Sequence, residues 1–377
     1  MKRFIQLICI AAMAICTHSC ASTIQAEETV VKLESHMNQS HKSSDLFSEE
    51  DLLVLKNPSD SSLVSSVDRV AIMDDRVFVL DQKKNQILAF DSNGEFVAST
   101  ARLIGKGKNE YIRLQNMAVD QSEKQIYLYC DAPYQMLVLD YDLHIVRRLD
   151  VDYLAREICM DSTCLYTLCH NIEKENEYEL RCYDKTDLNG MYRLLVLYDK
   201  CIPGIFASGK SICSDGSRCF CSMPFDNRIY EVCDGKIDNV YVIDFGNKWF
   251  DYSSSKGVGG TAFINQNREK NWLIQNISFS NAFIVFNTNK SRSFFVNLRD
   301  NTGAMYRTQV NDLFPFSCST YTPCQSENKG FAALTIPDEH SQAILDDIRD
   351  KSCPEISDKW DTISSKNGCN PMILKLK

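Results

Sequence analysis

The chain alternates between short apolar runs and polar breaks, and the apolar runs come in closely spaced pairs. The clearest pair is formed by residues 76–81, Arg-Val-Phe-Val-Leu-Asp, and residues 86–91, Gln-Ile-Leu-Ala-Phe-Asp. Val, Ile, Phe, Tyr and Leu dominate the runs, whereas Gly, Asn, Asp and Lys fill the breaks. This distribution is typical of β-strands joined by tight turns. The pattern therefore predicts two consecutive strands for each pair.

Six such pairs follow one another along the chain. They occupy residues 77–81 with 87–91, 126–131 with 136–140, 165–169 with 180–184, 219–222 with 229–232, 283–287 with 294–298, and 331–336 with 372–376. A further apolar run precedes each pair and another follows each of the earlier pairs, so a unit holds four strands. Four-stranded units repeated every roughly 40–65 residues are typical of β-propeller blades. We predict an all-β fold, a six-bladed β-propeller of four-stranded blades around a central channel.

The two ends of the repeat complement each other. The last unit lacks an outer strand because the sequence ends at Lys377, while an unassigned run, Asp-Leu-Leu-Val-Leu-Lys, precedes the first unit at residues 51–56. A strand at 51–56 would complete the last blade and remove two exposed sheet edges. We therefore predict a propeller domain over residues 51–377 that its N-terminal strand closes.

The N-terminus has the pattern of an export signal. Lys2 and Arg3 precede an apolar stretch, residues 4–15, that is too short to span a bilayer as a stable anchor. We assign residues 1–19 to a signal peptide.

Cys20 follows the signal in a sequence that resembles a bacterial lipobox. We predict that Cys20 carries a lipid and becomes the mature N-terminus; cleavage near Ala21 or Ala26 without lipidation is the alternative. Residues 20–50 are polar and lack a sustained period, so we interpret them as a tether between the lipid and the propeller. The protein is then expected at the cell envelope, anchored by its lipid to the outer membrane, with the membrane face left open.

Several segments resemble a known family. Residues 65–81 and 85–94 look like the six-bladed β-propeller lipoproteins of Bacteroidota, which are similar to NHL-repeat proteins. Residues 104–111, Ile-Gly-Lys-Gly-Lys-Asn-Glu-Tyr, resemble their Gly-x-Gly-x-Gly-Glu-Tyr signature, with Asn in place of the third Gly, and residues 370–377 resemble their closing strand. The resemblance covers about residues 45–377. It implies the fold and the envelope location, and it implies no chemistry.

The charge of the chain argues against one class of partner, and its cysteines raise the question of disulfides and metals. The chain carries 41 Lys and Arg against 50 Asp and Glu, a net charge of −9, which argues against nucleic acid because phosphate binding needs clustered basic residues. Among its 17 cysteines, Cys318 with Cys324 and Cys353 with Cys369 are candidates for disulfides in an oxidising compartment. The alternative is that most are apolar core residues, as expected for Cys219 inside a strand. No zinc-like spacing is present, and we predict no metal.

No catalytic residue is predicted. The chain has no Gly-x-Ser-x-Gly motif, and its remaining histidines stand in polar, surface-type contexts.

Six-bladed lactonases hold calcium at the channel with Asp, Asn and Glu, and Asn116 and Asn276 are the side chains considered for that role here. Gly105 and Gly107 lack a following helix, so we interpret them as a tight crossing above Tyr111, with a ligand loop as the alternative.

The segment 246–272 is the one long insert that the repeat does not explain. It carries Trp249, Phe250, Tyr252 and Trp272 around a flexible Ser- and Gly-rich stretch. Aromatic faces suit sugars or apolar ligands, and long loops are often functional. We predict Trp249, Tyr252 and Trp272 as ligand-binding residues; the alternative is that the rings cap the edge of the propeller.

These observations favour a binding or scaffold module at the cell envelope over an enzyme. Its partner is expected to be a glycan, a peptide or an envelope protein, with membrane contact only through the N-terminal lipid. The alternative function is a calcium-dependent hydrolase or lactonase that uses the propeller channel. A structural subunit of an envelope complex is the third reading, favoured by a large apolar patch on one rim.

Overall fold

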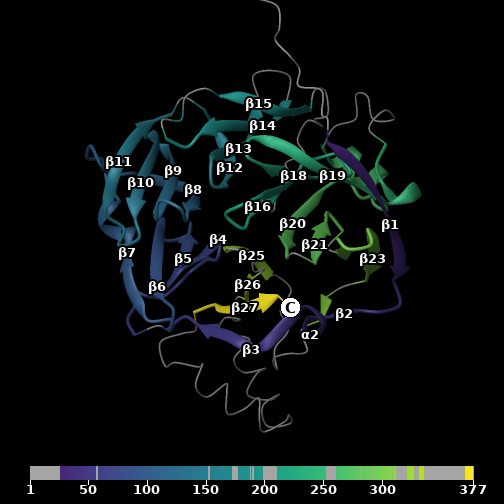
Figure 1. Ribbon diagram of the computed structural model, residues 1–377, viewed down its shortest axis with the longest axis horizontal. Coiled ribbons are helices and arrows are strands. Elements are labelled where there is room, and N and C mark those ends of the chain that lie inside the picture. Colours follow the sequence, from purple (N-terminus) through teal and green to yellow (C-terminus); the bar gives the residue numbers. More distant parts are fainter. Residues whose placement is uncertain are drawn as a thin grey trace, which may run out of the picture.

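The computed structural model describes residues 26–56, 58–151, 153–171, 177–186, 188, 191–197, 210–251, 260–280, 282–290, 292–307, 309–310, 321–326, 331–334 and 370–376. Antiparallel groups of strands stand side by side around a central axis (Figure 1). A radial array of such groups is a β-propeller. The all-β propeller that the repeat predicts is therefore confirmed.

Consecutive strands of each group run from the centre of the ring outward (Figure 1). The first two groups are β4 (Arg69–Met73), β5 (Arg76–Asp81), β6 (Gln86–Asp91) and β7 (Phe96–Ser99), then β8 (Arg113–Asp120), β9 (Gln125–Ala132), β10 (Tyr134–Asp140) and β11 (Ile145–Asp150). The next two are β12 (Ala155–Met160), β13 (Cys164–Asn171), β14 (Glu177–Asp184) and β15 (Tyr192–Leu197), then β16 (Ile212–Ser214), β17 (Cys219–Ser222), β18 (Arg228–Cys233) and β19 (Lys236–Asp244). The last two are β20 (Ile274–Phe279), β21 (Phe283–Thr288), β22 (Ser293–Asn297) and β23 (Thr302–Tyr306), then β25 (Tyr321–Ser326), β26 (Phe331–Leu334), β27 (Met372–Leu376) and β3 (Phe47–Val54).

Both faces of the inner strands are buried, because each group packs between two others. Along β5, Phe78 and Leu80 belong to the apolar cluster shared with β8, β9 and β10. Val77 and Val79 of the same strand belong to the cluster shared with β26 and β27. Successive side chains of a strand point to opposite faces, so a strand buried on both sides is apolar throughout. This explains why the runs in the sequence are continuous rather than strictly alternating.

The strand expected to close the ring is present. β3 pairs antiparallel with β27, with Val54 opposite Met372, so the chain ahead of the first group forms the outer strand of the last. β3 begins and ends earlier than the predicted range, 51–56. At the other side of the same sheet, β25 pairs in parallel with β4 and joins the last group to the first. Gly94 has a φ of +76°, and a Cβ there would lie 1.9 Å from the carbonyl oxygen of Val54, so the turn after β6 requires glycine.

The structure corrects the expected tether over residues 20–50. In its described part, β1 (Glu27–His36) is a strand that pairs in parallel with β19 and with β23. β2 (His41–Lys42), which pairs with β24 (Gln309–Val310), then leads through α2 (Ser43–Leu46) into β3. The pairing makes one nine-stranded sheet out of two groups. Charged side chains on the solvent face hid the alternation that places Val31 on the buried face.

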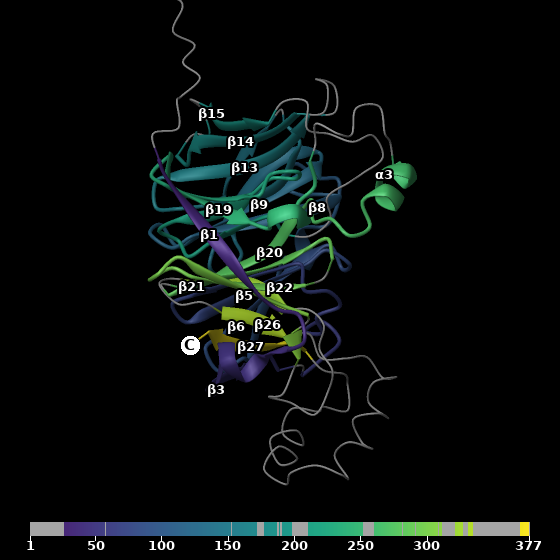
Figure 2. The ribbon, with the colours of Figure 1, turned by 90° about the vertical axis from the view of Figure 1, so that its right-hand side faces the viewer.

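β1 crosses the outer edges of two groups diagonally (Figure 2). Val31 is fully buried, and Leu33 packs partly against the same apolar cluster. Gly303 of β23 lies opposite Leu33, and a Cβ at Gly303 would stand 2.7 Å from Leu33 Cδ2 and 3.0 Å from Val31 Cγ1. Backbone pairing and this close approach, rather than a large apolar face, hold β1 in place. The strand also covers two edges that would otherwise be open to other chains.

Helices are few and short in the described part of the chain. They are α2 (Ser43–Leu46), α3 (Gly260–Gln266) and the 3-10 turns η1 (Thr100–Leu103) and η2 (Gly246–Lys248). Within those residues, no helix has the length and apolar character that a membrane crossing requires.

Candidate functional site

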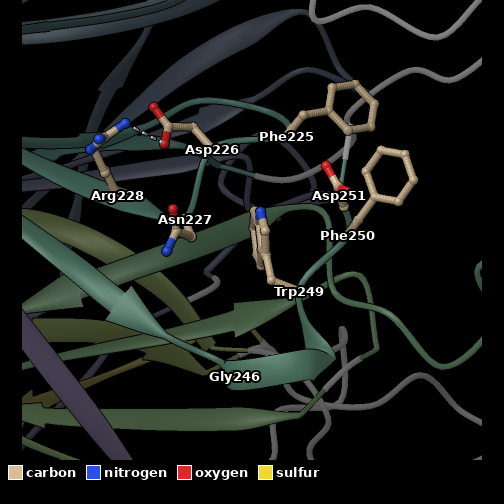
Figure 3. Close-up of a pocket in the computed structure, with 8 residues that line it drawn as sticks. All are labelled: Phe225, Asp226, Asn227, Arg228, Gly246, Trp249, Phe250 and Asp251. Atoms are coloured by element: carbon tan, nitrogen blue, oxygen red, sulfur yellow. Dashed lines mark hydrogen bonds and ion pairs between the residues drawn. The ribbon is translucent and has the colours of Figure 1, made fainter. Parts of the chain in front are cut away.

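A pocket of about 490 Å³ lies where the insert after β19 folds back over the start of β18 (Figure 3). Two segments line it, the turn that leads into β18 and the segment that begins with η2. The lining residues are Phe225, Asp226, Asn227, Arg228, Gly246, Trp249, Phe250 and Asp251. Figure 3 shows Trp249 between a polar side, formed by Asp226, Asn227 and Arg228, and an aromatic side, formed by Phe225 and Phe250.

Phe225 enters the pocket from a strained backbone. Its φ is +61°, a left-handed conformation that is rare for a bulky residue and that is unfavourable by about 1–3 kcal/mol. Two contacts with Trp272 stabilise it. The Phe225 N–H donates to the Trp272 carbonyl oxygen at 2.8 Å, and the two rings stack with centroids 5.6 Å apart. Trp272 therefore fixes the position of Phe225 from behind the pocket.

Trp249 is placed by the short turn η2. Gly246 opens this turn with a φ of +54°, which glycine adopts without strain. The Trp249 ring stacks on Phe245, with centroids 4.8 Å apart and planes 24° apart. Phe245 belongs to the apolar cluster beneath, so one face of the indole rests on the core while the ring also borders the pocket.

Asn271 ties the two ends of the insert together. Its side chain is buried, and its Oδ1 accepts a hydrogen bond from Thr288 Oγ1 at 2.8 Å. Its N–H donates to the Lys248 carbonyl oxygen at 2.7 Å, and its own carbonyl oxygen accepts from the Phe250 N–H at 2.8 Å. These bonds hold the backbone on both sides of Trp249, so the aromatic wall of the pocket is preformed.

The polar side of the pocket is also held in place. The Asp226 carboxylate is buried; it accepts a hydrogen bond from the Tyr230 hydroxyl at 2.6 Å and pairs with Arg228 Nη1 at 3.4 Å. Burial and the Asp226 charge raise the pKa of Tyr230 far above its usual range, so its hydroxyl stays a donor. Glu28 of β1 lies 3.5 Å from Arg228 Nε, which connects the added strand to the pocket. Asn227 Nδ2 donates to the Ile243 carbonyl oxygen at 2.9 Å, which holds this side chain in place.

The structure brings together some of the residues expected from the insert. Trp249 lines the pocket, whereas Trp272 packs behind it in a cluster with Phe225, Phe250 and Phe263. In that cluster the rings of Phe250 and Phe263, which lies on α3, meet edge to face at 4.7 Å. Tyr252 and the predicted lipid site, Cys20, lie outside the described residues.

Half of the pocket was not expected from the sequence. The turn Pro-Phe-Asp-Asn at residues 224–227 lies between two paired strands, where the repeat predicts only a connection. Its signal is the bulky Phe225 in a turn whose other residues, Pro224, Asp226 and Asn227, favour tight turns. Nothing in the sequence alone places this turn beside Trp249.

A charged network crosses the centre of the ring, where the alternative function would place a metal. Arg69 of β4 is buried; it donates to the Ile158 carbonyl oxygen at 2.6 Å and pairs with Glu157 of β12 at 3.4 Å. The Glu157 carboxylate also accepts hydrogen bonds from the Ser211 N–H, at 3.0 Å. Lys210 is half-buried, and burial together with the Arg69 charge lowers its pKa to about 8. Side chains from several groups therefore meet here, and two of them, Arg69 and Lys210, are cationic.

The two asparagines considered as calcium ligands take part in hydrogen bonds of this region. Asn116 Nδ2 donates to the Arg156 carbonyl oxygen at 3.4 Å, and Asn276 Oδ1 accepts from the Lys210 N–H at 3.3 Å. Among the described residues, no group of three or more His, Cys, Asp or Glu side chains is arranged to hold a metal ion. Nearby positive charge also disfavours a divalent cation at this place.

The Gly105 and Gly107 loop has the structural role expected for it. The Glu110 carboxylate fills the space at both glycines, where a Cβ would lie 2.0 Å and 3.0 Å from it. Beneath the loop, Tyr111 is fully buried, and its hydroxyl lies 2.7 Å from Thr100 Oγ1. This arrangement packs the connection between the first two groups, and the Glu110 side chain lies against both glycines.

Comparisons with known proteins agree with the fold. A family model described as a domain of unknown function, DUF4934, matches residues 28–377. Among solved structures, a protein of Bacteroides fragilis that is predicted to be exported is similar with a TM-score of 0.65 and 17% identity, over 93% of this chain and 99% of that chain. At this identity the likeness shows the fold alone. BamB of Moraxella catarrhalis is more distant, with a TM-score of 0.41 and 7% identity over 71% of each chain. Among curated proteins no significant match is found.

Proposed function

This chain belongs to the DUF4934 family, and we propose that it is an exported, lipid-anchored β-propeller that binds a glycan at the cell envelope. The preformed pocket around Trp249 is the observation that carries the proposal. A rigid ring that carries an elaborated loop suits recognition, because the loop can bind while the ring keeps it ordered.

We further propose that the ring has six blades. Five of them are the groups β4–β7, β8–β11, β12–β15, β16–β19 and β20–β23, and the sixth combines β25, β26 and β27 with β3. β1 then belongs to no blade and is an addition to two of them. This count matches the six-bladed, NHL-like lipoproteins of Bacteroidota that the sequence resembles.

The N-terminal sequence supports export and lipidation. The Bacteroides fragilis protein of similar fold is itself predicted to be exported. In this proposal the lipid on Cys20 is separated from β1 by residues 21–26 alone. Because an extended chain covers at most about 3.5 Å per residue, the ring would sit within about 20 Å of the bilayer. The rim where β1 begins would then face the membrane closely.

The chemistry of the pocket favours a glycan over an apolar ligand. A sugar ring has C–H faces that pack on an aromatic ring and hydroxyls that need donors and acceptors. Trp249 supplies the aromatic contact, while the carboxylate of Asp226 and the guanidinium of Arg228 lie across from it, already held by an ion pair. An apolar ligand would instead remove water from this ion pair without offering it any hydrogen bond in return. A glycan satisfies both sides of the pocket.

We do not propose the calcium-dependent hydrolase. That function needs a hard-cation site at the channel, and the side chains that meet there include Arg69 and Lys210. Glu157, a carboxylate of this network, already pairs with Arg69 and accepts backbone hydrogen bonds. A cation entering here would have to displace these contacts.

The proposal is tested with the purified full chain in detergent on an array of bacterial envelope glycans. We expect binding to one glycan class and a loss of at least about tenfold in affinity, or about 1.4 kcal/mol, for Trp249→Ala. The matched variant Trp272→Phe keeps a ring behind Phe225 and is expected to bind as the natural chain does. An absence of glycan binding, or a Trp249→Ala variant with unchanged affinity, would refute the proposal. Capture of a protein partner through the same residues would also contradict it and support the peptide reading.

A further inference from the structure

Two buried cysteines from neighbouring groups of strands lie in contact. Cys159 belongs to β12 and Cys219 to β17, and both are fully buried. Their Sγ atoms are 3.0 Å apart. That separation is longer than the roughly 2.05 Å of a disulfide bond, yet closer than unbonded sulfur atoms normally pack. Both residues are unbridged thiols in the structure.

The surroundings of this pair are apolar. Cys159 and Cys219 belong to one cluster with Leu168, Leu180 and Val232, at the interface between the groups β12–β15 and β16–β19. Burial raises the pKa of the Cys159 thiol well above its ordinary value, and the Cys219 sulfur adds to the effect. The folded protein therefore keeps the thiol protonated, and thiolates are the reactive form.

We propose that Cys159 and Cys219 form a disulfide when the chain folds under oxidising conditions, so that a covalent bond joins two neighbouring groups of the propeller. Each thiol gives up its hydrogen, and the two sulfurs share a new bond. The two electrons and two protons reduce one disulfide of the oxidant, either a protein oxidoreductase or oxidised glutathione, to two thiols. In the cell the oxidant depends on the proposed export; in a refolding reaction it does not.

Burial sets the time at which the bond can form. Once the two groups have packed, an oxidant reaches neither sulfur, and burial disfavours the thiolate of Cys159. Bridging must therefore occur while the interface is still open. After packing, the same burial protects the disulfide against reductants in solution.

Other cysteines lie near Cys159 and Cys219, so the partner of Cys159 has to be identified among them. Cys221 shares a face of β17 with Cys219, because the two are two positions apart, and it belongs to the same cluster. Cys213 packs in the cluster on the other side, where its Sγ contacts the Phe220 carbonyl oxygen at 3.9 Å. The contact at 3.0 Å singles out Cys219 as the partner of Cys159.

The experiment refolds the denatured, reduced full chain in a mixture of oxidised and reduced glutathione and maps disulfides by mass spectrometry. We expect the peptide with Cys159 to be linked to Cys219, as fragmentation on either side of Phe220 will show. Cys159→Ser and Cys219→Ser should each lose this link, and Cys130→Ser, a buried cysteine of a different cluster, should keep it. Two free thiols at these positions after refolding, or a Cys159 bond to another cysteine, would overturn the proposal.

Two further measurements test when the bond forms and whether it forms in cells. Folded, reduced protein exposed to the same mixture should remain unbridged, because its sulfurs are buried; rapid bridging would contradict the account of timing. Protein taken from cells after alkylation of its free thiols should carry the link. If the link forms in refolding and is missing in cells, the disulfide proposal stands and the proposed export to an oxidising compartment fails.

Discussion

The groups β8–β11 and β16–β19 are built from the same repeat and differ in what has been added to them. β8–β11 has four strands of six to eight residues each and nothing beyond the repeat. In β16–β19 the innermost strand shrinks to three residues, the outermost grows to nine and accepts β1 as a neighbour. The same group supplies half of the pocket and one cysteine of the buried pair.

This contrast separates the scaffold from its additions. Where the repeat is regular, buried apolar side chains pack the strands and carboxylates such as Asp81 and Asp140 hold the turns. Where the repeat is irregular, a strained turn, an aromatic insert and an added strand lie close together. We infer that the ring supplies stability and that the irregular side supplies recognition. Substitutions on the two sides should therefore have separable effects.

The largest effect is expected from Asp81→Ala on the regular side. Asp81 is fully buried, and its carboxylate accepts hydrogen bonds from the Ser65 N–H at 2.6 Å, from Ser66 Oγ at 2.9 Å and from the Lys84 N–H at 3.0 Å. Removal leaves the two backbone N–H donors without this partner and should lower the free energy of unfolding by about 3 kcal/mol. Urea denaturation measures the loss. Glycan affinity of the folded fraction should not change, and a selective loss of affinity would break the comparison.

A smaller effect is expected from Gly303→Val, which acts on the added strand. The new side chain would collide with Val31 and Leu33 of β1 and should lower stability by about 1–3 kcal/mol. Hydrogen exchange should speed up over residues 27–36 and stay slow in β8–β11. Because Glu28 pairs with Arg228 beside the pocket, glycan affinity should also fall. Unchanged exchange in β1 would show that the close approach at Gly303 does not hold the strand.

The smallest effect is expected from pH, through Lys210. Its pKa is lowered to about 8 from an ordinary value of 10.5, so between these values the unfolded chain binds the proton and the folded chain releases it. Stability should therefore rise as pH increases from 8 to 10.5 and should lack this contribution below 8. Lys210→Met should remove the rise, and the exposed Lys83→Met should keep it. Other groups titrate in the same range, so the difference between the natural chain and each variant, from urea denaturation, is the relevant quantity.

The scaffold could be predicted from the sequence because it repeats. Each pair of runs around residues 77–91 or 126–140 folds as strands close to the expected positions, and even the closing strand β3 followed from counting. Every copy supports the others, so a weak local pattern becomes a strong one. β1 could not be predicted in this way, since it occurs once and pairs with strands far away in the sequence. Its alternation is short, and its solvent face is charged.

The candidate site could be predicted from the sequence only where a rare residue type, tryptophan, points to it. Trp249 stands out because the chain has three tryptophans and two of them lie in the insert. Nothing in the sequence distinguishes Phe225 and Arg228 in this way, since they belong to an ordinary connection between paired strands. They lie close to Trp249 because the folded ring brings two connections that are separate in the sequence to the same rim. The contact between Cys159 and Cys219 was hidden for the same reason.

Binding of a glycan at Trp249 is the central claim, and the indole N–H signals of the three tryptophans test it most directly. In a spectrum of uniformly ¹⁵N-labelled protein, Trp→Phe substitutions assign the signals of Trp249, Trp272 and Trp360. Titration with the glycan identified on the array should shift the Trp249 signal strongly and the Trp272 signal weakly, because Trp249 borders the pocket and Trp272 packs behind it. A saturating titration that leaves the Trp249 signal in place would contradict the account.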